Sequence, residues 1–364
     1  MADPNVVLRD PRRRGLVLLG AAAAIAIVLA ALSLWHQASL VAPKYVPESF
    51  FSNLMARERG VARIHIESHK YGAFDIDFKP SSGWVLPGEH DYPADFALVH
   101  TTLVGMAGLE TIAPKTSRAD WLHYLDLGTP SKNGHGTLIS LLDEHGKVIA
   151  SLIAGKTKDI GEPGGATGLF VRKPDSNQSW LVRSVFTPKP DPNDWLNKDV
   201  IGVDRARIRE AVVTPSSGPA YTVRRDKPSD SDFTLAEMPK GRTLSYNSAP
   251  DGVAAAIVGF TFDKVAPASR FDFTHASRLV TRTFDGLVVT AHVIKMGDDY
   301  WATLSAEAKP DKTAIRDEAH KINKRASGWA FRIPSYKGAQ FMTARDSLLK
   351  PVETKRKKAR RKTK

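Results

Sequence analysis

The sequence predicts an α+β protein in which an N-terminal transmembrane helix is followed by two repeated β-rich α+β domains. Three observations predict this class. A long uncharged apolar stretch lies near the N-terminus, and short segments after it alternate apolar and polar residues as half-buried strands do. The second half of the chain then repeats the order of segments found in the first. With 364 residues, 42% of them hydrophobic, the chain is long enough for more than one core.

The apolar stretch has the length and composition of a transmembrane helix. It lies between Arg14 and His36 and carries no charged side chain. As a helix, Leu16 to Trp35 would span roughly the 30 Å hydrocarbon layer. Trp35 stands where an aromatic residue commonly anchors a helix at the membrane surface, and arginines precede the stretch. The positive-inside rule therefore predicts a cytoplasmic N-terminus and an exported body.

A cleaved signal peptide is the alternative interpretation of this stretch. Small residues around 38–42 resemble a peptidase site. The apolar run, however, is longer than the usual signal-peptide core of about 7 to 15 residues, which favours the uncleaved helix. Both interpretations export the body.

The first predicted unit follows a short Pro-bearing linker and a brief helix. Gly72 marks a turn between two alternating segments, and Pro93 marks the start of a helix. The predicted elements are strands at 61–67, 74–78 and 84–86, a helix over 94–109, and a long hairpin of 136–142 with 147–154.

The second predicted unit repeats this order. It consists of an extended segment over 203–213, strands at 220–224 and 233–235, an apolar helix over 252–262, and a closing hairpin of 278–293 with 299–305. A helix over 314–324 and a last pair of strands at 329–333 and 339–343 are expected after it. The predicted divisions of the chain are a cytoplasmic basic N-terminus (1–14), the transmembrane helix (15–35), a linker and short helix (36–60), the first repeat (61–190), the second repeat (191–310), a C-terminal helix and strands (311–349), and a basic disordered tail (350–364).

Several segments of the body resemble the bacterial domain-of-unknown-function family 4340 (DUF4340). They are YPAD at 92–95, AGKTKD at 154–159, GLFVRK at 168–173, WLVRS at 180–184, DWLNKDVIGVD at 194–204, YTVRR at 221–225, FDGL at 284–287 and GWAFRIPSYK at 328–337. The resemblance implies a single-pass envelope protein with repeated β-rich domains, of a kind often linked with gliding-type ABC transporter components. It implies no reaction and no catalytic residue.

One motif invites comparison with a zinc site. His65, Glu67 and His69 lie on one face if the segment is a strand, so a surface zinc site would need one further ligand. The zinc-protease pattern H-E-x-x-H does not fit, because the Glu is one position late and that pattern requires a helix. A solvated strand face is the favoured interpretation.

The segment Gly155-Lys156-Thr157 is similar to the end of a phosphate-binding loop. The Walker pattern requires a glycine where this chain has Ala150, and no helix is predicted after Thr157. Nucleotide binding is therefore not expected. The glycine-rich run at 161–168 is interpreted as a turn, with a mobile contact loop as the alternative.

The carboxylates give no catalytic pattern. Asp75 shares a strand face with Asp77, and Asp298 and Asp299 lie at a predicted hairpin tip, where acidic residues are ordinary. The chain has no G-x-S-x-G elbow. No catalytic residue, metal ligand, cofactor-binding residue or cofactor is therefore predicted, and we expect a protein that is not an enzyme.

The net charge of +13 is concentrated at the ends of the chain. Residues 350–364 hold nine Lys or Arg against one Glu, and residues 1–14 hold four Arg against two Asp, which leaves +3 for residues 15–349. The body is therefore nearly neutral, which argues against nucleic-acid binding, because that function requires Lys and Arg clustered on the folded surface. The basic tail is expected to meet anionic lipid or another anionic envelope surface, with a solubilising extension as the alternative. The absence of cysteine excludes disulfides, thiolate zinc sites and a cysteine nucleophile.

Taken together, these features predict a membrane-anchored extracytoplasmic binding or scaffold protein. We expect it in the bacterial inner membrane, with the N-terminus cytoplasmic and the body periplasmic. The expected partners are membrane lipid, through the helix, and a transporter or other envelope protein. The alternative is an envelope hydrolase or carbohydrate-binding protein with its site between the two repeats.

Overall fold

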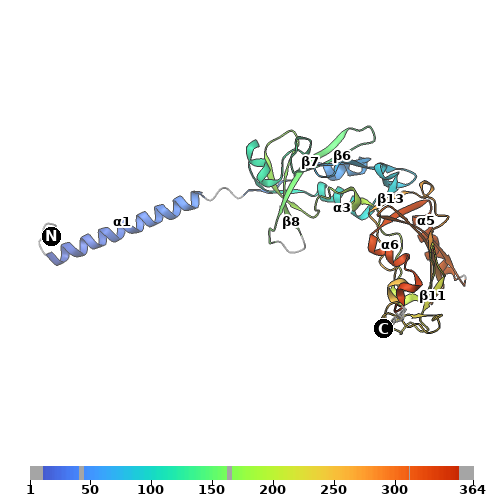
Figure 1. Ribbon diagram of the computed structural model, residues 1–364. Helices are drawn as coiled ribbons and strands as arrows, with labels where there is room; N and C mark the ends of the chain where they lie inside the picture. Colours follow the sequence, from blue (N-terminus) through green and yellow to red (C-terminus); the bar gives the residue numbers. More distant parts are fainter. Residues whose placement is uncertain (1–10, 41–44, 162–165, 311, 352–364) are drawn as a thin grey trace, which may run out of the picture.

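A computed structural model describes residues 11–40, 45–161, 166–310 and 312–351. Helix α1 (Pro11–Leu40) extends away from the folded body (Figure 1). Its segment Gly15–Leu34 has a mean hydropathy of 2.7, is long and apolar enough to cross a membrane, and is not buried by any other described part of the chain. The predicted apolar helix is confirmed. The basic tail from residue 352 onward and part of the glycine-rich run, 162–165, lie outside the described residues.

Nine strands of the described chain form a first antiparallel sheet. Their order across the sheet is β4-β3-β2-β1-β6-β7-β8-β9-β5. Two short helices, α2 (Leu54–Arg57) and η2 (Glu58–Gly60), precede it, and α3 (Phe96–Ala107) packs beside it. The strands are β1 (Arg63–Ser68), β2 (Gly72–Lys79), β3 (Gly83–Leu86), β4 (Tyr92–Pro93), β5 (Glu110–Pro114), β6 (Thr137–Leu142), β7 (Val148–Lys158), β8 (Thr167–Arg172) and β9 (Ser179–Ser184).

Eight further strands of the described chain form a second antiparallel sheet, in the order β12-β11-β10-β14-β15-β16-β17-β13. Helix α5 (Thr313–Ala326) packs on β16 and β15, and α4 (Asp251–Ala254) and α6 (Ser335–Phe341) pack beside it. The strands are β10 (Ile208–Thr214), β11 (Tyr221–Arg224), β12 (Thr234–Leu235), β13 (Lys264–Pro267), β14 (Ser277–Thr283), β15 (Leu287–Met296), β16 (Asp299–Ala308) and β17 (Trp329–Ile333).

The two sheets share one strand order. Without β4, the first sheet reads β3-β2-β1-β6-β7-β8-β9-β5, and each strand has a counterpart at the same place in the second. In both sheets the strand that follows the first helix, β5 or β13, lies at the far edge against the last strand of its sheet. The predicted α+β class is confirmed, and the shared order is the one expected of a repeated unit. The second sheet also continues past residue 310 through β17.

The apolar helix predicted over 252–262 is wrong beyond its first turn. Only Asp251–Ala254 is helical, and the chain then continues in turns, with Val258 N donating to Ala255 O. Gly259 adopts a positive φ of 59°, which ends any helix. The residues are apolar because the segment is buried, not because it is helical: Ile257, Phe260 and Phe262 are all in the core.

Two other predicted elements are corrected. The segment 339–343 is not a strand, because α6 begins after Pro334 and runs to Phe341. Proline is favoured at a helix start, and this signal was missed. The single long strand predicted over 278–293 is two strands, β14 and β15, separated by a turn in which Gly286 has a φ of 108°. The counterpart of the β6–β7 hairpin is therefore β14–β15, not the hairpin of β15 with β16.

The two sheets are joined through one hydrophobic core. Most of the buried hydrophobic residues of both sheets belong to one continuous cluster. Tyr92 on β4 lies between them: its ring contacts the rings of Trp329, Phe331 and Phe262 in edge-to-face geometry, with centroids 5.0, 6.3 and 5.9 Å away. Its hydroxyl donates to Asn197 O at 2.9 Å. The aromatic contacts make Tyr92 the main side-chain link between the halves.

Candidate functional site

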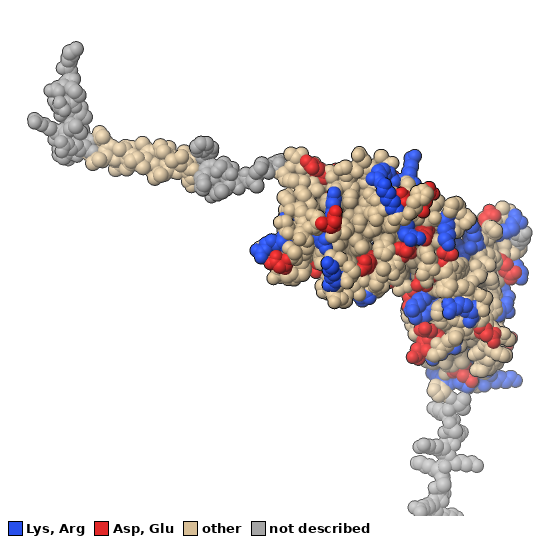
Figure 2. Space-filling model, turned by 90° about the horizontal axis from the view of Figure 1, so that it is seen from above, with Lys and Arg blue, Asp and Glu red and all other residues tan. Residues whose placement is uncertain are grey.

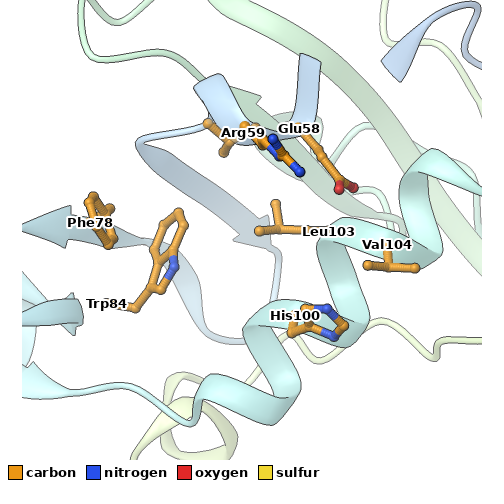
Figure 3. Close-up of a pocket in the computed structure, with 8 residues that line it drawn as sticks. Glu58, Arg59, Phe78, Trp84, His100, Leu103 and Val104 are labelled. Atoms are coloured by element: carbon orange, nitrogen blue, oxygen red, sulfur yellow. The ribbon is translucent and has the colours of Figure 1, made fainter. Parts of the chain in front are cut away.

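A groove lies between η2, the β2–β3 hairpin and α3 (Figure 3). Its volume is about 240 Å³. Figure 3 shows its side chains arriving from three directions, with the aromatic pair on the hairpin opposite the side chains of α3. The residues that line it are Glu58, Arg59, Val61, Phe78, Trp84, His100, Leu103 and Val104.

Helix α3 forms one wall of the groove. Asp95 caps it, its carboxylate accepting hydrogen bonds from Ala97 N and Leu98 N at 2.9 and 3.1 Å. On the inner face Gly105 permits close packing, since a Cβ there would lie 2.5 Å from Phe186 Cδ1. The helix contains no Asp, Glu, Lys or Arg, so its outer face carries no acidic or strongly basic side chain, and Phe96 on that face is 68% exposed beside His100 and Thr101. An uncharged face with a large exposed aromatic side chain is available for contact with another molecule.

The opposite wall is an aromatic pair on the hairpin. Phe78 and Trp84 are direct cross-strand partners, and their ring centroids are 5.5 Å apart. Cross-strand aromatic pairs stabilise each other, so the wall is preformed. Phe78 is nonetheless 47% exposed, whereas Trp84 is partly buried against the core.

The rim supplies polar groups. Glu58 and Arg59 stand on η2, and His100 stands on α3 at the mouth. Glu58 Oε2 is buried and has no hydrogen-bond partner among the described residues. A buried carboxylate oxygen without a donor is costly, so a turn of the Glu58 side chain toward a ligand that brings an N–H or ammonium group would be favourable. The groove therefore offers an apolar floor and one unsatisfied acceptor, an arrangement suited to binding.

A second pocket, lined by more charged residues, lies at the junction of the two halves. Its volume is about 320 Å³, and Tyr92, Pro93 and Asn197 form one side. The other side is α5, from which Lys321, Lys324 and Arg325 project at a spacing that places them on one face. Arg325 pairs with Asp199 at 3.1 Å, which leaves the pocket with an excess of positive charge. The removal of Tyr92 from water raises the pKa of its phenol well above the usual range, so the hydroxyl stays protonated.

The structure separates the residues of the zinc interpretation. His65 and Glu67 do lie on the outer face of β1, but His65 Nδ1 is paired with Asp75 Oδ1 at 2.7 Å. His69 follows the end of the strand, and its ring lies 6.1 Å from that of His135. In the described ranges no three or more His, Asp or Glu side chains are grouped closely enough to hold a metal ion.

The other sequence candidates have local structural roles. Gly155 lies within β7, where a Cβ would lie 2.1 Å from Leu125 O, and Lys156 Nζ donates to Tyr124 O at 3.0 Å. The glycine and lysine of the Gly155-Lys156-Thr157 segment thus contact the last residues of the neighbouring helix η4 (Ala119–Leu125). Asp77 pairs with Arg63 at 2.7 Å, and Asp299 lies 3.5 Å from Arg332.

Sequence reasoning missed the groove. A signal was present in α3, whose outer positions carry Phe96 and Val104 where a surface helix normally carries charge. The pairing of Phe78 with Trp84 was implied by the predicted hairpin. The position of Phe78 and Trp84 opposite α3 depends on the tertiary packing of that helix and could not be predicted from the sequence.

Comparison with known proteins gives one match. A family model described as "Domain of unknown function (DUF4340)" matches residues 84–277. No curated protein and no solved structure matches the chain. The matched region begins at β3 and ends at the start of β14, so it includes α3 and the junction of the two sheets.

Proposed function

The chain belongs to the DUF4340 family, whose members carry a domain of unknown function, and on that premise we propose a membrane-anchored binding protein whose groove receives an apolar segment of a partner protein. The observation that carries the proposal is the groove beside α3, with its exposed aromatic wall and its unsatisfied Glu58 oxygen. We further propose that α1 stays in the membrane as an uncleaved anchor.

The size of the groove favours a side chain over a whole ligand. Small-molecule sites usually have volumes of roughly 300 to 1,000 Å³, above the 240 Å³ found here. One or two large apolar side chains fit such a volume and are the usual anchors of a protein interface. A Lys or Arg next to these anchors would satisfy Glu58 Oε2. The proposed occupant is therefore an apolar segment with a basic residue.

The orientation of the body and the class of partner are part of the proposal. Arginines before the span favour a cytoplasmic N-terminus and a periplasmic body in the bacterial inner membrane. The family resemblance makes an ABC-type transporter the first partner to test, as an analogy. A reporter fused after residue 351 checks the orientation: activity of a periplasmic reporter is expected, and activity of a cytoplasmic reporter would contradict it.

Site-specific crosslinking tests the groove. A photo-crosslinking residue at His100 is expected to give a discrete adduct with a partner protein in native membranes, whereas the same residue at His145, an exposed position in the β6–β7 turn, gives none. Phe78→Ser and Glu58→Gln are expected to reduce the adduct at least fivefold. Tyr336→Ser, an exposed aromatic of the second half, is the matched control and leaves it unchanged. An adduct insensitive to both groove variants, or no adduct at all, would refute groove docking.

A second candidate function is favoured by the junction pocket. Its cations suit an acidic carbohydrate, which corresponds to the carbohydrate-binding alternative with a site between the two halves. Titration calorimetry of the full-length protein with an acidic oligosaccharide, and separately with a neutral one, tests this function. The acidic sugar alone is expected to bind, and the double variant Lys321→Gln/Lys324→Gln is expected to lose at least tenfold in affinity. Equal binding of the neutral sugar would exclude this function.

A further inference from the structure

The end of the body nearest to α1 carries an exposed aromatic patch. The patch consists of Arg118, Trp121, His123, Tyr124 and Lys156, and all but Lys156 lie on or beside the helix η4 (Ala119–Leu125). Trp121 is 48% exposed and Tyr124 is 64% exposed. Figure 1 shows the segment around residue 120 at the end of the body that faces α1.

The patch is held in a fixed orientation. Leu122, on the inner side of η4, is buried in a small cluster with Leu127 and Ile153. Gly155 lets β7 approach the carbonyl of Leu125, and Lys156 Nζ donates to Tyr124 O. With these inner contacts made, the rings of Trp121 and Tyr124 are left facing solvent.

Short contacts connect the first described residue of the body to the patch. The ring of Tyr45 lies 6.0 Å from that of Trp180 on β9. The adjacent Ser179 donates from N and from Oγ to Thr116 O, and the hydroxyl of Thr116 accepts from Arg118 N at 3.1 Å. Arg118 in turn lies over the ring of Trp121, 4.6 Å from its centroid. The patch is therefore built on the part of the sheet at which the chain enters from α1.

The length of the connection keeps this end close to the membrane. If Gly15–Leu34 spans the bilayer, the helical residues from Leu34 to Leu40 add about 9 Å. The chain from Leu40 to Tyr45 reaches at most about 18 Å when fully extended. Tyr45 therefore lies within roughly 27 Å of the hydrocarbon layer, and part of that distance is headgroup region.

The chemistry of the patch matches that of a lipid headgroup layer. Trp and Tyr are enriched at membrane surfaces, because one part of the ring is apolar and another forms hydrogen bonds. Lys115, Lys156 and Lys158, which belong to the patch or lie within three residues of it in sequence, are exposed, and Lys156 Nζ lies 3.9 Å from Asp126 Oδ1. Asp120 is paired with Arg118 at 2.7 Å, so its charge is compensated. Lysines beside lipid contact phosphate groups.

We infer that this aromatic patch lies on the phospholipid headgroup surface and holds the body in one orientation relative to the membrane. The inference rests on the proposed anchoring by α1. The groove beside α3 would then be presented at a set height and direction above the bilayer, instead of moving freely on a tether.

The absence of cysteine allows a direct test with single labelled positions in the full-length protein. His123→Cys places a fluorophore in the patch. His145→Cys places one in the β6–β7 turn, at the other end of β7, about 30 Å away along that strand. His275→Cys places one on the second half. Each labelled protein is reconstituted in liposomes that carry a headgroup-linked quencher.

The expected result is quenching at position 123 at least threefold stronger than at 145 or 275. Trp121→Ser/Tyr124→Ser in the His123→Cys protein is expected to reduce that quenching to the level of the other two positions. Tyr246→Ser/Tyr336→Ser, which changes exposed tyrosines of the second half, is expected to leave it unchanged. Equal quenching at 123 and 145 in protein that floats with the liposomes would overturn the headgroup contact alone. Protein that fails to float would overturn the anchoring itself and the contact with it.

Discussion

The two halves of the body have the same strand order, but they surround it with helices of different character. In the first, α3 contains no Asp, Glu, Lys or Arg and leaves Phe96 and His100 exposed. In the second, α5 is amphipathic, with Ile315, Ala319 and Ile322 buried against the sheet and charged residues outside. The corresponding helix α4 is a single turn that contacts α6, with Val253 and Ala254 buried. One topology thus provides an exposed uncharged face in one half and a closed, charged surface in the other.

The two halves of the body also differ in the charged residues at their surfaces. Figure 2 shows Lys and Arg interspersed with Asp and Glu over the face in view, with large uncharged areas in the part of the body next to α1. The second half contains a network in which Arg207 bonds both Asp285 and Glu318 at 2.8 Å. The two halves therefore share the architecture of their sheets, whereas the helices packed on each sheet determine which surface is exposed for contact.

The largest expected effect comes from separating the halves. Tyr92→Ala removes the ring that contacts Trp329 and Phe331, and it should lower the free energy of unfolding by about 3 to 5 kcal/mol. Calorimetry is expected to show two transitions in place of one, because the ring contacts that couple the two sheets at Tyr92 are lost. Tyr92→Phe keeps the ring and loses only the bond to Asn197 O, for about 1 kcal/mol. An unchanged single transition in Tyr92→Ala would show that the halves are coupled elsewhere.

Each half has one buried arginine whose guanidinium bonds no carboxylate among the described residues. Arg172 donates to carbonyls that include Leu127 O and to Thr129 Oγ1, and Arg225 donates to carbonyls that include Ile208 O. Burial lowers the pKa of both groups. Arg172→Met and Arg225→Met should each cost about 3 kcal/mol, because several buried acceptors lose their donor. Denaturant unfolding measures this, with the exposed Arg224→Met expected within about 0.5 kcal/mol of wild type.

Two glycines test close packing in the two halves. Gly155→Ala would place a Cβ 2.1 Å from the backbone oxygen of Leu125, and Gly338→Ala would place one 2.1 Å from Cγ of Tyr300. The first should cost about 3 kcal/mol and the second about 2 kcal/mol, because the partly exposed Tyr300 can rotate whereas the backbone cannot. Thermal unfolding measures both. Gly60→Ala, with no atom within 4 Å of the added carbon, is the control, and equal losses in all three would refute the distinction.

The smallest effect concerns pH. Burial tends to raise the pKa of Asp285, but hydrogen bonds from Thr283 and Arg207, together with the charge of Arg207, outweigh it and lower that pKa. A carboxyl whose folded pKa is lowered adds stability that is present above its ordinary pKa and is lost as pH falls through the folded value. Asp285→Asn should therefore be less stable than wild type at pH 7 by under about 1 kcal/mol, with the difference disappearing toward pH 2. A difference that stays constant with pH would contradict this origin.

The sequence predicts the parts of this fold that depend on short-range pattern. The strands around Ile64, Ile76 and Val223 follow from alternation, and α5 from its apolar stripe. The segment after Ala254 was not predictable in this way. Its residues are apolar at nearly every position, and such a run does not distinguish a buried turn from a helix. What settles its conformation is Lys337, about 80 residues later, whose buried ammonium group donates to the carbonyls of Ala256 and Val258.

The functional surfaces were less predictable than the fold. The groove needs the register that pairs Phe78 with Trp84 and the packing that brings α3 opposite them. The aromatic patch needs η4 to be turned by Leu122 so that Trp121 faces outward. Sequence alone identified the strands of the hairpin and the helix separately, because the distances between them are set by contacts between residues far apart in the chain.

The position of the edge strands has a consequence for how the protein is made. In each half, the strand that follows α3 or α4 pairs with the last strand of its own sheet. Arg183 on β9 bonds Glu110 on β5, 73 residues earlier, and Arg332 on β17 bonds Asp263, just before β13 and 69 residues earlier. During synthesis β5 therefore emerges long before its neighbour exists. Until then it presents an unpaired edge, the kind of surface on which chains aggregate. Closure of the first sheet is timed by the arrival of β9, and a nascent chain stalled before residue 184 would be left open to association with others.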